Sequence, residues 1–133
     1  MVKGTDGHWL SVREAGQVEQ AIAALRRTAP TGGSSLQNAF AVIKELNPAP
    51  DNVILVTDGL PTQGDKPPLM RTLVTMEQRE DLMQEAVKAL PPSPPQINIV
   101  LLPMEGDPSA PIYFWRLARA TGGDFLSPAK DWP

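Results

Sequence analysis

Two short polar segments contain residue types that could hold a metal ion, Gly32-Gly33-Ser34-Ser35 and Thr57-Asp58-Gly59. Magnesium takes oxygen ligands in a near-octahedral array and readily keeps some of its waters. A serine hydroxyl and an aspartate carboxylate both supply such oxygens. Ser34 and Asp58 therefore carry oxygen atoms of the kind that a metal ion could use.

Two further acidic residues follow the next apolar run of the chain. Glu105 and Asp107 belong to a loop that leaves this run, so they could approach Asp58 from the same side. An acidic loop is more often simply solvated. We therefore place Glu105 and Asp107 as second-tier metal candidates.

Purely structural roles for the same residues stay open. Ser34, with Gln37 three residues later, has the spacing of a capping box and would cap a helix whether or not a metal binds. Asp58-Gly59 could form only the turn at the end of a strand. The two glycines could also bind a phosphate through bare N–H groups, but no lysine follows and the spacing of a phosphate-binding loop is missing.

The common catalytic arrangements do not fit this sequence. His8 is the only histidine and there is no cysteine, so neither a histidine zinc cluster nor a cysteine nucleophile can form within the chain. Val56 stands where a haloacid dehalogenase-type phosphatase has its nucleophilic aspartate, and no Gly-x-Ser-x-Gly motif occurs. We therefore expect a protein that is not an enzyme.

Helices and strands that alternate along the chain must position these residues. Val53–Val56 is a continuous apolar run, which predicts a strand buried on both faces of a parallel sheet, and Ile97–Leu102 is a second candidate for a buried strand. Capping boxes, apolar periodicity and proline or glycine stops predict four helices. We expect these helices over 14–27, from Ser34 to before Pro48, from Thr75 to Leu90, and from about Pro111 to Gly122. A short last strand is expected at Phe125-Leu126. This order predicts an α/β fold with a Rossmann-like, open, mainly parallel sheet flanked by helices. Ligands bind such sheets at the carboxyl edge of the strands, which is where Asp58 falls.

The two polar segments and their surroundings resemble the second half of the metal-ion-dependent adhesion site of a von Willebrand factor A (vWA) domain. The resemblance is carried by residues 30–36, followed by Ala39-Phe40, and by residues 53–59 with Pro61, and it extends over roughly 14–128 in the order of the family's elements. In that family, a threonine after the two glycines reaches the metal directly or through water, and the aspartate of Thr-Asp-Gly is the third element of the site. Ser34 matches the first position and Asp58 the second, so the resemblance implies that Ser34 and Asp58 are metal-ligating positions.

The resemblance implies an adhesion-type, protein-binding module with Mg²⁺, Mn²⁺ or Ca²⁺ in the full-length parent and an acidic residue of a protein partner completing the site. The family's first strand carries an Asp-x-Ser-x-Ser motif, and no such triplet occurs in this sequence. The resemblance therefore implies a domain truncated on its N-terminal side, whose adhesion site is incomplete and binds metal weakly or not at all.

Composition limits the partners. A length of 133 residues with 41% apolar residues fits a single domain over 1–133. The formal charge is −3 and the twelve lysines and arginines are scattered, so we expect no binding of nucleic acid. The longest apolar runs are far below the roughly 18 residues that a membrane span needs. We therefore expect no membrane span within the chain.

The absence of a first strand would leave 53–58 at the edge of the sheet, and exposed apolar edges are normally covered. We predict one of three outcomes: pairing with a second copy in a homodimer, capture of the segment Trp9–Val12, or poor order around the strand. The alternative function is accordingly a metal-independent interaction or assembly scaffold that self-associates through this edge.

Overall fold

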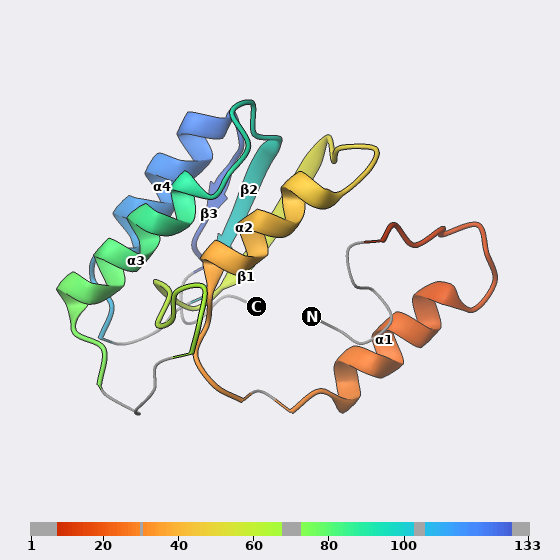
Figure 1. Cartoon of the computed structure of the whole chain (residues 1–133), viewed down its shortest axis with the longest axis horizontal. Coiled ribbons are helices and arrows are strands. Elements are labelled where there is room, and N and C mark those ends of the chain that lie inside the picture. The colour runs from red at the N-terminus through yellow and green to blue at the C-terminus, as the bar shows by residue number, and fades with distance from the viewer. Residues whose placement is uncertain (1–7, 30, 68–72, 103–105, 129–133) are drawn as a thin grey trace.

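The computed structural model describes residues 8–29, 31–67, 73–102 and 106–128. Within them the chain forms four helices and three strands, in the order α1 (Gln17–Arg27), α2 (Leu36–Glu45), β1 (Asn52–Thr57), α3 (Met76–Lys88), β2 (Gln96–Leu101), α4 (Ala110–Thr121) and β3 (Phe125–Leu126). The strands form one parallel sheet in the order β1-β2-β3. The predicted α/β class and the parallel sheet are therefore confirmed (Figure 1).

The local signals identified the elements closely. Thr75 caps α3, its hydroxyl accepts from the backbone N–H of Gln78, and the Gln78 side chain accepts from the backbone N–H of Thr75, so the predicted capping box is confirmed. Gly122 ends α4 in a left-handed conformation, as a glycine stop should. The next position, Gly123, also requires glycine, because an added Cβ there would lie only 1.9 Å from the carbonyl oxygen of Ile97. None of the described helices is long and apolar enough to cross a membrane.

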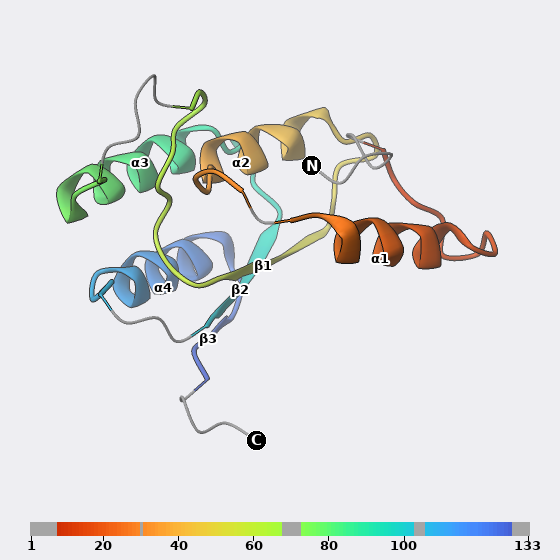
Figure 2. The ribbon, with the colours of Figure 1, turned by 90° about the horizontal axis from the view of Figure 1, so that it is seen from below.

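The hydrophobic core lies on one face of the sheet, between the strands and helices α2, α3 and α4 (Figure 2). Alternate residues of β2 are almost fully buried there, and they face buried residues from all three helices: Ile97, Ile99 and Leu101 from the strand, and Phe40, Met83, Ala86, Phe114 and Leu117 from the helices. Burying this many large side chains is the main driving force for folding.

The opposite face of the sheet corrects the prediction that the strand at Val53–Val56 is buried on both sides. Burial alternates along β1, and Ile54 and Val56 remain 71% and 59% exposed. The apolar run is continuous because its outward residues are apolar too. Within the described residues no helix covers that face. The expectation of a helix-flanked sheet therefore holds for one face only.

Helix α1 stands apart from this core. It contributes no buried residue and lies beyond β1, on the side away from β2 (Figures 1 and 2). The segment Trp9–Val12 is not a strand and does not pair with β1, so the predicted capture of this segment is wrong. Trp9 instead donates its indole N–H to the carbonyl of Pro48, at 2.8 Å. This contact satisfies the indole at the turn that precedes β1.

Candidate functional site

The Gly-Gly-Ser-Ser segment contacts the loop that follows Asp58 at the carboxyl edge of the sheet. The carbonyl oxygen of Ser34 accepts hydrogen bonds from the backbone N–H groups of Thr62 and Gln63, at 3.0 and 3.1 Å. The N–H of Ser34 donates to the Thr62 hydroxyl oxygen at 3.0 Å. Three hydrogen bonds thus join the start of α2 to the loop that follows Asp58.

Gly33 allows this close approach. A Cβ at this position would lie 2.9 Å from Cβ of Gln63 and 3.0 Å from the hydroxyl oxygen of Thr62. Real Cβ atoms essentially never come closer than 3.0 Å to a non-bonded heavy atom of a residue elsewhere in the chain. The second glycine of the Gly-Gly-Ser-Ser segment is therefore needed for the contact between the two chain segments.

The N-cap of α2 is Ser35, which corrects the assignment to Ser34. Ser35 has extended backbone dihedrals, and its hydroxyl accepts from the N–H of Asn38 at 3.2 Å. The backbone of Ser34 is held by Thr62 and Gln63, and Ser34 lies one residue before the N-cap. The hydroxyl of Ser34 is exposed and, within the described residues, makes no hydrogen bond. The Ser34 hydroxyl therefore does not cap α2.

Asp58 follows β1 directly and is exposed. The preceding Thr57 forms a local turn, since its hydroxyl donates to the Gly59 carbonyl at 2.9 Å. In the described parts of the chain the Asp58 carboxylate has neither an ion pair nor a hydrogen bond. Both predicted first-tier oxygens, from Ser34 and Asp58, are therefore exposed at the same edge of the sheet.

Asp107 belongs to a buried polar cluster with Arg79 and the backbone of Leu60. Its side chain is 1% exposed, and its Oδ2 atom lies 2.8 Å from the Arg79 guanidinium and accepts from the Leu60 N–H at 2.7 Å. Arg79 in turn donates to the Leu60 carbonyl through Nε and Nη2, at 3.2 and 2.6 Å. The second carboxylate oxygen, Oδ1, is buried and has no hydrogen-bond partner among the described residues. Asp107 thus holds both polar atoms of the Leu60 backbone in place, directly and through Arg79, and fixes the loop that carries Asp58 and Thr62.

The sequence did not indicate Arg79 as a partner of this loop. An arginine four residues after the N-cap of an amphipathic helix usually faces solvent, and no nearby sequence signal connects Arg79 to Leu60. Glu105, the other second-tier candidate, lies outside the described residues.

The arrangement does not amount to a complete metal centre. The described residues contain no group of three or more His, Cys, Asp or Glu side chains that could hold a metal ion. Ser34 and Asp58 offer two oxygens, whereas Mg²⁺ takes six, so four would have to come from water or from another protein group.

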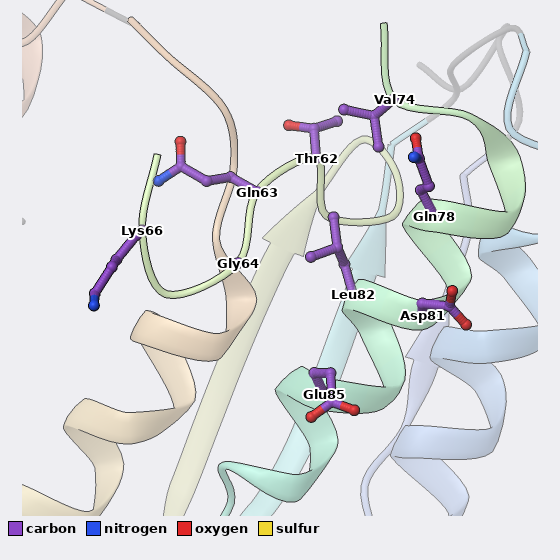
Figure 3. A pocket seen from close by; sticks show the side chains of 9 residues that line it. All are labelled: Thr62, Gln63, Gly64, Lys66, Val74, Gln78, Asp81, Leu82 and Glu85. Carbon is purple, nitrogen blue, oxygen red and sulfur yellow. The ribbon is translucent and has the colours of Figure 1, made fainter. Parts of the chain in front are cut away.

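A cavity of about 370 Å³ adjoins the same loop, between residues 62–66 and α3. Leu82 projects from α3 toward the loop, and Thr62 and Val74 lie around it (Figure 3). Acidic side chains of α3, Asp81 and Glu85, contribute to its lining. Thr62 lines this cavity and also contacts Ser34, so the cavity adjoins the segment that carries Ser34.

Comparisons of the chain with protein-family models, with curated proteins and with solved structures gave no match.

Proposed function

We propose that this chain is a protein-binding module of the vWA type that binds its partner at the carboxyl edge of the sheet. The observation that carries this proposal is the set of three hydrogen bonds between Ser34 and the loop that follows Asp58. They hold the Gly-Gly-Ser-Ser segment against the loop that leaves the Thr-Asp-Gly segment, so the two parts of the vWA resemblance are linked through Thr62 and Gln63. The adjoining cavity and the clamp around Leu60 support the same conclusion, because a binding edge needs a fixed backbone and a shaped surface.

The metal contributes to this function only through a weak, partner-completed site. Two protein oxygens can share a hydrated Mg²⁺ or Mn²⁺, and an acidic side chain of the partner can supply a further ligand. With so few protein ligands, we expect dissociation constants of about a millimolar or weaker for the free chain.

A titration with Mn²⁺ tests the site. The paramagnetic ion should broaden the NMR amide signals of Ser34 and Asp58 before those of the rest of the chain, and the variant Asp58→Asn should lose this selectivity. Asp51→Asn is the matched control, since Asp51 is also exposed but precedes β1 at the other end of the strand. Uniform broadening, or broadening that survives Asp58→Asn, would remove the metal from the proposal.

A second candidate function is metal-independent self-association through β1. Among the described residues β1 pairs only with β2, so its other side offers unpaired backbone groups next to the exposed Ile54 and Val56. Edges of this kind template pairing with another chain, and a lysine on the edge opposes it. Light scattering should show a mass that rises with concentration for the natural chain and stays monomeric for Val56→Lys. A concentration-independent monomer for both would eliminate this candidate.

A further inference from the structure

The face of the sheet opposite the core forms an apolar surface with no cover in the described structure. We call it the open sheet face; it comprises the outward residues Ile54 and Val56 of β1, Val100 of β2, Leu102 just after it, and Leu126 of β3. Four of these side chains are between 43% and 71% exposed. Parallel sheets are normally covered on both faces, so this surface has the composition of a buried one.

The polar residues of that face are already paired with one another. Asn98 donates to Asn52 at 3.0 Å and accepts from the Asp124 N–H at 2.8 Å, while Asn52 donates to Gln96 at 3.3 Å. Gln96 donates to the Gly122 carbonyl. No strand residue on this face is charged. A partner can therefore cover the face without leaving a buried charge or a row of unsatisfied amides.

Helix α1 has an apolar side that no other part of the described structure buries. Val18, Ile22 and Leu25 form a stripe at positions i, i+4 and i+7, yet none of them is buried and Leu25 is 58% exposed. An isolated helix of 11 residues is marginal in water, because tertiary packing of its apolar side provides most of its stability. Helix α1 therefore needs an apolar surface.

The dimensions of the two surfaces match. A helix of 11 residues is about 16 Å long and about 10 Å wide with its side chains. The six-residue strands are about 20 Å long, and three strands span about 10 Å between the outer two. One α1 helix is therefore large enough to cover the open sheet face.

We propose that α1 of one chain packs on the open sheet face of a second copy of this chain, in a reciprocal exchange. Helix α1 projects beyond the β1 edge, where a second copy that pairs through β1 would lie (Figures 1 and 2). Its flanks are held at opposite ends of β1, by the Trp9–Pro48 bond on one side and by the Ser34–Thr62 contacts on the other. A two-fold exchange uses the same contact twice and covers both faces. This inference deepens the self-association candidate and rests on it.

Cross-linking between two single-cysteine variants tests which chain supplies α1. Because the sequence has no cysteine, Ile22→Cys and an affinity-tagged Ile54→Cys each carry one thiol. A mixture treated with a short bis-maleimide should yield the mixed covalent dimer, whereas the tagged Ile54→Cys mixed with Gln20→Cys should yield much less, since Gln20 lies on the opposite side of α1. A cross-link within single molecules of the double variant Ile22→Cys/Ile54→Cys, at dilutions where only monomer exists, would overturn the exchange.

A second pair of variants separates this inference from assembly through the β1 edge alone. Ile22→Lys/Leu25→Lys should weaken dimerisation by roughly tenfold or more, whereas the control Gln20→Lys should leave it unchanged. The core helices should fold normally in all of them, because α1 buries no residue. A dimer that is sensitive to Val56→Lys but unaffected by Ile22→Lys/Leu25→Lys would overturn the role of α1 and leave edge pairing intact. A monomer at all concentrations would overturn both.

Discussion

Substitution of Asp107 by alanine should destabilise the whole domain, although the residue belongs to a loop. The carboxylate is the only counter-charge in contact with Arg79 among the described residues, and it accepts the N–H of Leu60, which is 2% exposed. Alanine removes both interactions at once. The Arg79 side chain, 13% exposed, would then be a largely buried charge without a partner.

The magnitude follows from this geometry. Breaking a buried ion pair by removing one partner costs about 3–5 kcal/mol. Arg79 keeps its two bonds to the Leu60 carbonyl, and the unpartnered Oδ1 of Asp107 disappears with the carboxylate, so we expect the lower end, about 3 kcal/mol. With a urea slope of roughly 1–3 kcal/mol per molar, the unfolding midpoint should fall by about 1–3 M.

Urea unfolding followed by far-ultraviolet circular dichroism measures this change. Asp51→Ala is the control, since Asp51 is exposed and we expect it to stay within about 0.5 kcal/mol of the natural chain. In the native state of Asp107→Ala, the NMR amide signals of 58–62 should also move. If Asp107→Ala unfolds at the same urea concentration as Asp51→Ala, then the ion pair does not stabilise the fold and our account of the loop is wrong.

Three further predictions use the same unfolding assay. Ser35→Ala should cost about 1 kcal/mol because Ser35 caps α2, whereas Ser34→Ala should change the free energy of unfolding by less than about 0.5 kcal/mol; the reverse order would restore Ser34 as the cap. Thr75→Ala should cost about 1 kcal/mol through loss of the capping box of α3, and an unchanged midpoint would contradict that role. Gly123→Ala should cost more than about 2 kcal/mol because its Cβ would overlap the Ile97 carbonyl, while Gly64→Ala, whose added Cβ makes contacts no shorter than 3.4 Å, should cost clearly less; equal effects would refute the steric argument.

The sequence by itself determined the elements and their order. Each of the signals used, such as the Thr75–Gln78 box, the run Val53–Val56 and the glycine after Thr121, depends on residues within a few positions of one another. Local hydrogen bonds and side-chain periodicity are encoded in such short windows. The alternation of these elements was enough to predict a parallel sheet, and it also placed Asp58 at the carboxyl end of its strand.

The tertiary structure decided which residues contact one another across the chain. Ser35 and not Ser34 is the cap, because Thr62 and Gln63 hold the Ser34 backbone. Asp107 contacts Arg79 and Leu60, from which it is separated by 28 and 47 positions in the sequence. The tertiary structure also decided that, among the described residues, only one face of the apolar strand β1 is covered. An apolar run indicates that the strand surface can be buried. The run does not identify the element that buries this surface, because that element lies elsewhere in the chain or on another molecule. For Ile54 and Val56, we infer that it is α1 of a second copy.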